Sequence, residues 1–342
     1  MFDVLVVGAG PVGLYSAKLC ESLGLNVAIL EEHKEIGRPK HCSGLVSTNI
    51  NKFFPDIESW GVIENKVNYA VLHANGIKLK LDKRHVAAYV IDRVKFDKKI
   101  HAMLTSKVFM KHKVMSIGKK DDCIFVNTNR ERLEGKILLA CDGSYSTIAR
   151  ILGISPKERI KGLIGITNEQ SRENHVDLFF DLSRLKDGFF WRIPRGETTE
   201  YGVFGRDVKL NELKGFFKKK PKEIYGGTIP IGLSNKLYLD RILLLGDAAG
   251  TVKPWSGGGV IYGLTSARIA CKIIKKSFDK NDFSESTLKD YEHLLKVAIG
   301  KQINIGLVLR DLMKVMNNGM LSFLFKYSSL LPLSWLDMDF IF

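Results

Sequence analysis

Residues 4–13 read Val4-Leu5-Val6-Val7-Gly8-Ala9-Gly10-Pro11-Val12-Gly13, an apolar run that passes directly into a G-x-G-x-x-G motif. At the end of a buried strand, Gly8 permits a tight turn and Gly10 lets backbone amides approach a pyrophosphate. Gly13 lets the following helix pack closely on the strand. The motif predicts a βαβ unit that binds a dinucleotide on the N-terminus of its first helix.

Two further features complete this unit. A helix is expected over about residues 12–23, and a second apolar strand over residues 26–30. The second strand ends at Glu31, at about the distance from the motif where an acid that binds ribose is expected. Together these features favour a bound dinucleotide over a tight turn without a ligand.

The composition is that of a globular protein. With 342 residues and 45% hydrophobic content, the chain is expected to form about two domains. Met1 leads directly into the first strand, so no export signal is expected. The five cysteines are scattered and form no C-x-x-C pair, which is typical of a reducing cytosol and predicts no structural metal.

The chain is basic. Lys and Arg number 52 and Asp and Glu 37, a net charge of +15, with clusters at residues 218–222 and 272–276. Two explanations stay open: a lysine-rich surface in solvent, or a surface that meets anionic lipid headgroups. Nucleic acid is disfavoured, because the sequence has no basic recognition helix, RNP-like motif or zinc finger.

The loop after the second strand contains reactive side chains. Residues 37–44 include Gly, Pro and Ser, which favour a loop over a helix. Cys42, between His41 and Ser43, is expected either to lie beside the reactive ring of the cofactor or to pack passively in the loop.

The next segment changes to alternating runs over residues 69–72 and 77–81, joined by Asn75-Gly76. This pattern predicts a hairpin and the start of an inserted antiparallel sheet. A helix over about residues 91–104 carries Arg93, which is either a cofactor contact or an ordinary surface arginine.

Two more acidic signatures follow expected buried strands. A β-rich meander over residues 113–133 and a short strand over residues 137–140 lead to Asp142-Gly143. A later strand leads to Gly246-Asp247 and then to a Gly-rich turn before a helix over about residues 260–275. Acids at the carboxyl ends of parallel strands point into the crevice that binds cofactors, and the helix amides can stabilise an anion.

Between these two signatures, residues 161–233 are predicted to form further strands, the expected substrate sheet. Residues 189–196 concentrate aromatic and basic side chains in the order Phe189-Phe190-Trp191-Arg192-Ile193-Pro194-Arg195-Gly196. Packing alone explains the aromatic residues, and so does an apolar ligand that lies across the sheet.

The three signatures, in this order, resemble the FAD-dependent p-hydroxybenzoate hydroxylase superfamily, and within it the geranylgeranyl reductase family of archaeal lipid and chlorophyll synthesis. The resemblance covers about residues 1–275 and implies non-covalent FAD. The residues it implies for cofactor binding are Gly8, Gly10, Pro11, Gly13, Glu31, Glu32, Arg38, Cys42, Gly44, Arg93, Asp142, Gly143, Gly246, Asp247, Pro254, Gly257, Gly258, Gly259 and Val260.

Within this superfamily, the geranylgeranyl reductase family is distinguished by the pattern Y-x-W-x-F-P followed by a later Gly. This chain has Phe189, Trp191, Ile193, Pro194 and Gly202 at that spacing, and these are the implied substrate-binding residues. Phe189 stands for Tyr and Ile193 for Phe, so a proton-donating hydroxyl is missing there. The implied catalytic residues are Cys42, Trp191 and Gly258.

We therefore expect an α/β chain, α+β overall. A Rossmann-like FAD-binding domain would be formed by residues 1–65, 91–160 and 236–290. A mostly antiparallel β-sheet substrate domain, from residues 66–90 and 161–235, would be inserted into it. Residues 291–342 would form a C-terminal helical cap that is shorter than is usual in the family.

The cap is expected to hold one long helix over about residues 291–316, followed by a shorter apolar run. Lys326 and Pro332 interrupt this run, so a membrane-spanning helix is not expected. The cap is expected either to pack on the flavin domain or to touch the bilayer with Trp335 and Phe342.

The function implied is hydrogenation of isoprenoid double bonds of geranylgeranyl chains, in archaeal-type membrane lipids. We hypothesise that protonation leads and that flavin supplies hydride to the more substituted carbon. Candidate acids are Cys42, His41 and a water near residues 257–259. A flavin-dependent monooxygenase or an electron-transfer flavoprotein stays an alternative.

The sequence holds no second G-x-G-x-x-G unit, so electrons are expected from transient NAD(P)H or from a ferredoxin. The expected location is the cytoplasm, either free or peripheral at the inner face of the cell membrane.

Overall fold

The computed structural model describes residues 1–120, 122–328 and 338–339. The βαβ unit lies at the centre of the larger sheet, whose parallel strands follow the order β8-β2-β1-β11-β18. Their bounds are Phe2–Val7 for β1, Val27–Glu31 for β2, Lys107–Met110 for β8, Arg132–Ala140 for β11 and Ile242–Leu244 for β18. Antiparallel strands β9 (Val114–Lys120), β10 (Cys123–Thr128) and β17 (Tyr238–Leu239) extend it. The short strand predicted over residues 137–140 is the end of a longer β11.

The register brings three predicted signatures to one edge of this sheet. Val7 of β1 pairs with Leu30 of β2 on one side and with Ala140 of β11 on the other. The chain leaves these strands at Gly8, Glu31 and Cys141-Asp142. β18 joins the same edge because Leu244 pairs with Ala140, which places Gly246-Asp247 nearby.

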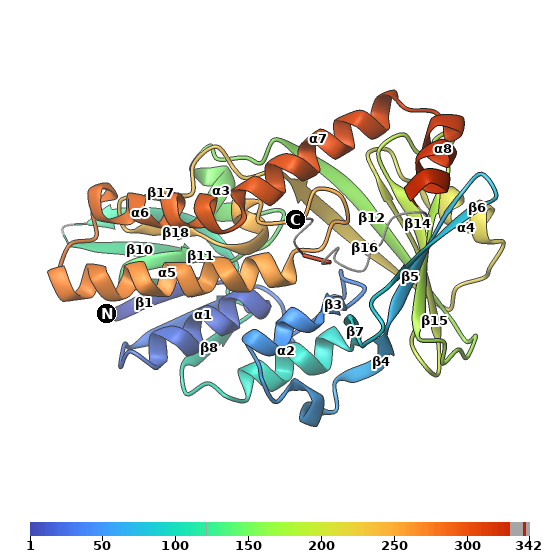
Figure 1. Cartoon of the computed structure of the whole chain (residues 1–342). Coiled ribbons are helices and arrows are strands. Elements are labelled where there is room, and N and C mark those ends of the chain that lie inside the picture. Colours follow the sequence, from blue (N-terminus) through green and yellow to red (C-terminus); the bar gives the residue numbers. More distant parts are fainter. Residues whose placement is uncertain (121, 329–337, 340–342) are drawn as a thin grey trace.

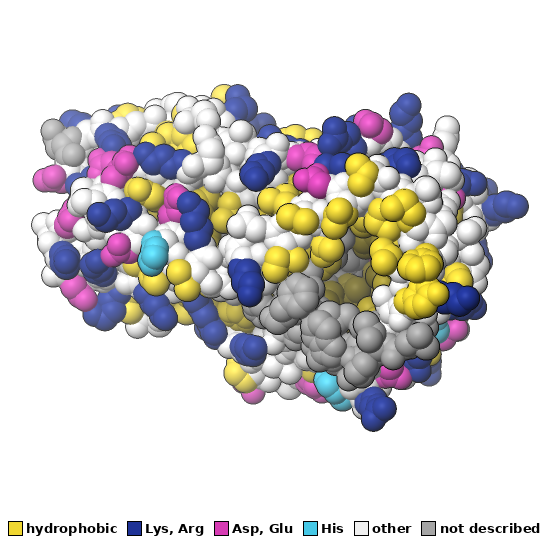
Figure 2. Space-filling model, turned by 45° about the horizontal axis from the view of Figure 1, so that its top comes forward, with side chains coloured by type: hydrophobic (Ala, Val, Ile, Leu, Met, Phe, Trp, Pro, Cys, Tyr) yellow, Lys and Arg dark blue, Asp and Glu magenta, His cyan; other side chains and the backbone are white. Residues whose placement is uncertain are grey.

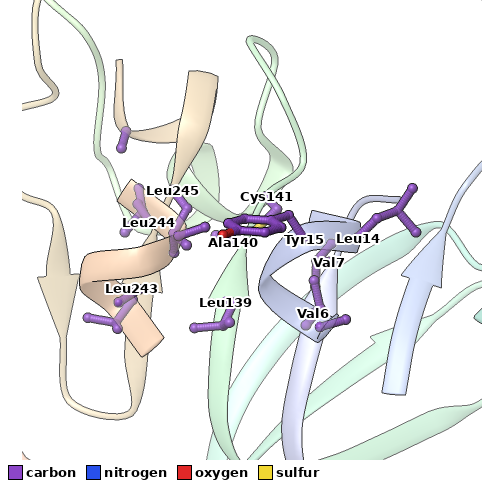
Figure 3. Close-up of a cluster of buried hydrophobic side chains, with 14 of the residues drawn as sticks. Val6, Val7, Leu14, Tyr15, Leu139, Ala140, Cys141, Leu243, Leu244 and Leu245 are labelled. Atoms are coloured by element: carbon purple, nitrogen blue, oxygen red, sulfur yellow. The ribbon is translucent and has the colours of Figure 1, made fainter. Parts of the chain in front are cut away.

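Two helices cover this sheet at the expected places, α1 (Pro11–Glu21) and α5 (Val260–Lys280). They approach closely, since a Cβ on Gly263 would lie 2.5 Å from a Val12 methyl carbon. Figure 3 shows apolar side chains of β1, α1, β11 and the segment around β18 meeting in the core beneath them. The shorter helices are α2 (Arg93–His101) and α3 (Thr147–Ile151).

The second large sheet has the order β16-β12-β15-β14-β13-β5-β6. The bounds are Glu223–Ile231 for β16, Glu158–Thr167 for β12, Thr199–Gly205 for β15, Phe189–Pro194 for β14, His175–Phe180 for β13, Tyr69–Ala74 for β5 and Ile77–Asp82 for β6. Within this sheet, as far as the structure describes it, only the β13–β5 pair is parallel. The predicted hairpin at Asn75-Gly76 is confirmed as β5 and β6. Helix α4 (Leu210–Phe217) covers one face, where Phe190 stacks on Phe216 with ring centroids 3.9 Å apart.

A three-stranded sheet, which the sequence did not predict, lies where the two large sheets meet (Figure 1). It consists of β3 (Leu45–Ser47), β7 (Ala88–Ile91) and β4 (Ile63–Val67), with short 3₁₀ turns at Thr48–Lys52 and Ile57–Trp60. Its strands are three to five residues long, too short for an alternation pattern to stand out in the sequence.

The predicted C-terminal helix is longer than expected and irregular. It begins with α6 (Glu285–Leu295), continues through a π-helical turn at Lys296–Gly300 and ends as α7 (Lys301–Val315). In Figure 1, α7 extends from the parallel sheet toward the seven-stranded sheet, where α8 (Asn318–Ser328) packs on β5 and β6. Buried Arg310 fixes α7 against the seven-stranded sheet, because its Nη2 nitrogen lies 3.0 Å from an Asp187 carboxylate oxygen. Among the described residues, no helix is both long and apolar enough to cross a membrane. Trp335 and Phe342 lie outside the described residues.

Candidate functional site

The glycine motif forms a backbone cradle that is open on one side. Gly8 has φ +98°, and a Cβ there would lie 2.4 Å from the carbonyl oxygen of Cys141. A Cβ on Gly13 would lie 2.0 Å from the carbonyl oxygen of Gly8. Around Gly10, by contrast, no described atom lies within 4 Å of a Cβ. Gly10 caps α1 without a side-chain hydrogen bond, so the helix N-terminus faces this open space and suits an anion.

Glu31 is largely buried at the end of β2. One carboxylate oxygen accepts a hydrogen bond from the Ala9 amide at 2.8 Å, and the other accepts from the His33 amide at 2.9 Å. Glu31 is therefore fixed beside the glycine motif. Glu32 is half exposed and lies 3.8 Å from the Lys113 ammonium. Arg38 lies 3.9 Å from a Glu35 carboxylate oxygen, beside a cavity of about 380 Å³ between residues 33–40 and β16.

Only one of the two carboxylate oxygens of Asp142 accepts a hydrogen bond within the described chain. One oxygen accepts a hydrogen bond from the Ile148 amide at 3.0 Å. The other is buried and has no partner among the described residues. Burial raises the pKa of Asp142. Because a buried unpaired oxygen is costly, this atom is suited to accept a hydrogen bond from a ligand.

Arg93, Cys42 and Asp247 come together. Arg93 begins α2 and pairs with Asp97 at 3.0 Å. Although burial disfavours its charge, Asp97 and Cys42 hold the pKa of Arg93 above its ordinary value. Burial raises the pKa of Asp247 to about 6, which the charge of Arg93 opposes. The Asp247 carboxylate has no hydrogen-bond partner in the described chain, so it is available to a ligand. Arg93 was predicted to be either a cofactor contact or an ordinary surface arginine. Its side chain is mostly buried, so the second interpretation is wrong.

The Gly-rich turn ends at Gly259, which caps α5 without a side-chain hydrogen bond. A Cβ on Gly259 would lie 3.0 Å from an Asp247 carboxylate oxygen, so this turn and Asp247 border the same space. A Cβ on Gly258 would lie 2.8 Å from Cε of Lys253. The two helix N-termini, α1 and α5, together with Asp142 and Asp247, therefore fit an elongated dinucleotide cofactor.

Sequence reasoning missed the group that holds Lys253. Its ammonium is buried and lies 2.9 Å from an Asp339 carboxylate oxygen and 3.1 Å from the Met338 carbonyl oxygen. Ser47 and Asn49 also donate to Asp339. The two partners are far apart in the sequence, and the only local signal was a lysine inside an otherwise uncharged turn.

Replacing Asp339 with Ala is expected to lower the free energy of unfolding by roughly 3–5 kcal/mol, because it leaves the buried Lys253 ammonium without its counter-charge. Urea unfolding monitored by circular dichroism measures this loss. The double variant Lys253→Met/Asp339→Leu should recover part of it, since no unpaired buried cation is left. An Asp339→Ala protein as stable as wild type would show that this ion pair does not anchor the C-terminus.

The predicted substrate residues lie in two packed clusters on one face of β14. Phe189 and Trp191 lie on the face of β14 opposite to Phe190, which packs under α4. They form a cluster with side chains of β12, β15, β16 and α7, namely Ile160, Phe204, Ile229 and Leu307. Ile193, 2% exposed, instead packs with Val67 and Val90 of the small sheet. Packing therefore accounts for Phe189, Phe190 and Ile193, and an apolar ligand across this face stays a prediction.

Gly202 lies directly opposite Trp191 in the β14–β15 pair. A Cβ on Gly202 would lie 2.0 Å from the indole ring, so the indole lies flat over this glycine. The indole N–H donates to a Glu200 carboxylate oxygen at 2.8 Å. The tryptophan and the later glycine of the sequence pattern are thus two parts of one packing arrangement.

The cysteine loop packs against the edge of this sheet. The His41 ring nitrogen Nδ1 lies 2.8 Å from the Gly226 carbonyl oxygen on β16. Gly44 has φ +73°, and a Cβ there would lie 2.1 Å from the Ile91 carbonyl oxygen. The loop thereby holds Cys42 between Arg93 and the edge of the seven-stranded sheet.

Comparisons with known proteins agree with this arrangement. No family model matches the chain. It is 30% identical over 338 residues to digeranylgeranylglycerophospholipid reductase 2 of Methanosphaera stadtmanae, covering 87% of this chain and 84% of the relative. A geranylgeranyl bacteriochlorophyll reductase-like protein of Thermoplasma acidophilum has the same fold, with a TM-score of 0.90, 24% identity and coverage of 99% and 94%. A halogenase solved with FAD matches with a TM-score of 0.69 and 16% identity over 86% of this chain and 73% of the halogenase.

Proposed function

Because the chain belongs to the digeranylgeranylglycerophospholipid reductase family, we propose that it is an FAD-dependent reductase of carbon–carbon double bonds in geranylgeranyl chains of archaeal-type membrane lipids. The observation that carries this proposal is the juxtaposition of two surfaces. The dinucleotide cradle has two helix N-termini without side-chain caps. Its Gly-rich turn lies against the apolar cluster that contains Phe189 and Trp191, since a Cβ on Gly257 would lie 3.0 Å from a methyl carbon of Ile229 in that cluster.

FAD fits the cradle by the chemistry of its donors and acceptors. The first-turn amides of α1 suit the pyrophosphate and Glu31 suits a ribose. Asp142 and Asp247 offer carboxylate oxygens without partners among the described residues. When bound, the flavin supplies hydride chemistry. With the cofactor in place, we assign the α5 N-terminus and the turn at residues 257–259 to stabilising negative charge on it.

The chain's own contribution is positioning and exclusion of water. An isolated alkene offers no group for a strong polar contact, so an apolar wall that fixes its orientation is the main source of catalysis. Phe189, Trp191, Phe204 and Leu307 supply such a wall. Phe189 has no hydroxyl, so the acid is sought among His41, Cys42 and a water near residues 257–259. We also propose that the chain is divided into a flavin domain, a substrate sheet and a C-terminal cap.

The test is anaerobic. The purified protein is reduced with dithionite and mixed with a geranylgeranylated phospholipid, while flavin absorbance and lipid mass are followed together. We expect reoxidation of the flavin and a gain of two hydrogens per reduced bond. Flavin that stays reduced until oxygen is admitted, with unchanged lipid, would contradict the proposal. Hydroxylation of an aromatic substrate would then support a monooxygenase, and no turnover an electron-transfer flavoprotein.

We propose that the electrons come from NAD(P)H or a ferredoxin that binds transiently. A net charge of +15 suits an acidic ferredoxin. Anaerobic mixing with NADPH, NADH or a reduced ferredoxin, each alone, identifies the donor by the rate of flavin bleaching.

We further propose that α7 and α8 touch the membrane from which the lipid enters. Figure 2 shows a hollow rimmed by hydrophobic side chains on the face that carries these helices. Val315 is 77% and Phe323 60% exposed, and Leu312, Met320 and Leu324 are also exposed. Such apolar side chains together with lysines are suited to an anionic bilayer surface.

Phe323→Glu/Leu324→Glu is expected to weaken binding to anionic lipid vesicles by about tenfold or more, because each buried large apolar side chain contributes roughly 1.5–3 kcal/mol. Vesicle co-sedimentation measures the loss. Met115→Glu is the matched control, because Met115 is equally exposed at 60% but lies on β9 of the other large sheet. Equal weakening by the control would contradict a specific contact through α8.

A further inference from the structure

Arg195 follows β14 and connects four separate parts of the chain. Its Nη1 nitrogen donates to the Ser43 carbonyl oxygen at 2.5 Å and lies 2.8 Å from a Glu200 carboxylate oxygen. Its Nη2 nitrogen donates to the Ile91 carbonyl oxygen at 3.2 Å and lies 2.6 Å from a Glu64 carboxylate oxygen. The side chain is only 9% exposed. Arg195 therefore fixes the backbone of the cysteine loop to the substrate sheet.

Glu200, on β15, is completely buried and has two donors. One carboxylate oxygen accepts from the Trp191 indole N–H at 2.8 Å, and the other from Arg195 at 2.8 Å. Only the ionised carboxylate accepts both hydrogen bonds without conflict, since a carboxylic acid carries a proton on one oxygen. Glu200 thus joins the indole of the apolar wall to the arginine that holds the cysteine loop.

From these contacts we propose that Arg195 and Glu200 are a pair of positioning residues, which fix Trp191 and the Cys42-Ser43-Gly44 loop relative to each other. This inference rests on the proposed function, because the two fixed elements are its substrate wall and its cofactor-side loop. The pair touches neither substrate nor cofactor and acts through Trp191 and Ser43. Its effect is to keep the double bond and the cofactor at a reactive separation.

Protonation of Glu200 controls this pair. Burial raises the pKa of Glu200 to about 7, while Arg195 and Trp191 oppose the rise and Glu64 adds to it. Tyr225 of β16 also faces Glu200, and Tyr225 in turn lies near Cys42 and Glu223. The proposal requires the ionised form, so the rate of lipid reduction should rise with pH through the region near 7 and level off above it. The ratio of the wild-type rate to the Glu200→Gln rate separates this effect from titration of the acid, and a ratio that does not rise with pH would contradict a positioning role.

Glu200→Gln tests the pair, because the amide cannot accept from both donors. At pH 8 we expect lipid-dependent reoxidation of the reduced flavin to be about tenfold slower than in wild type, the effect of one lost charged hydrogen bond. The pH dependence near 7 should vanish, while reoxidation by oxygen is unchanged. Arg195→Lys should slow lipid reduction in the same direction, because an ammonium cannot contact all four oxygens. A Glu200→Gln enzyme with the wild-type rate and pH profile would overturn the proposal.

Glu169→Gln is the matched control. Glu169 also accepts from an aromatic side chain and a cation, Tyr201 and Lys219 at 2.7 Å each, but on the opposite face of the sheet. It should leave the rate and its pH profile unchanged, and a similar slowing there would contradict a specific role for Glu200.

A second readout does not depend on activity. We measure alkylation of Cys42 by iodoacetamide with peptide mass spectrometry, and use Cys123 of the same protein as the internal reference. Glu200→Gln should accelerate alkylation of Cys42 relative to Cys123, because the loop loses its anchor. If the wild type does not reduce lipid, the proposed function fails, yet this ratio still tests the pair. An unchanged ratio would show that Glu200 does not hold the loop.

Discussion

Gly10→Val is expected to give a folded protein that purifies without flavin. A Cβ on Gly10 meets no described atom within 4 Å, and the residue has φ −75°, which any residue adopts. The fold therefore tolerates the side chain. The isopropyl group would fill the space through which the cofactor phosphates reach the amides of α1. Losing two or more charged hydrogen bonds weakens flavin binding by roughly 3 kcal/mol or more, above a hundredfold.

The ratio of flavin to protein absorbance measures this loss, and the melting temperature of the flavin-free protein reports the fold. Gly215→Val is the control, because Gly215 on α4 is also open to a Cβ and lies on the other large sheet. It should keep the flavin. Normal flavin content in Gly10→Val would show that the cofactor does not approach this cradle.

Gly202→Ala is expected to abolish lipid reduction while flavin stays bound. The new Cβ would lie 2.0 Å from the Trp191 indole, which must leave its place over β15 and its hydrogen bond to Glu200. The wall that we propose to orient the double bond would then be lost, and misplacement by about 1 Å can cost a hundredfold in rate. Overpacking should also lower the free energy of unfolding by roughly 1–3 kcal/mol.

The double variant Trp191→Phe/Gly202→Ala distinguishes a specific clash from general damage. The smaller phenyl ring extends less far over Gly202 than the indole, whose atoms the new Cβ would overlap, so the double variant should be more stable than Gly202→Ala alone. Urea unfolding of all four proteins gives the coupling energy. Strictly additive losses would mean that the indole does not lie over Gly202. Single-turnover reoxidation by lipid, compared with reoxidation by oxygen, shows whether activity returns with stability.

Local sequence patterns were enough to predict the nucleotide-binding sheet of this protein. The G-x-G-x-x-G motif, Glu31, Asp142-Gly143 and Gly246-Asp247 each stand at the end of an apolar strand. Parallel strands end at one edge of a sheet, so local patterns were enough to bring these residues together. The Asn75-Gly76 hairpin was predictable for a similar reason, because turn geometry fixes the register of its two strands.

How the two large sheets are joined could be seen only in the folded chain. The small sheet, the contacts of Arg195 and Glu200 and the Lys253–Asp339 pair link residues that the sequence separates widely. The sequence could not show which side of β14 packs under α4, because alternate residues of one strand face opposite sides of a sheet and both sides here are apolar. Local pattern fixes secondary structure, but the partner of a buried charge is fixed only when the chain has folded around it.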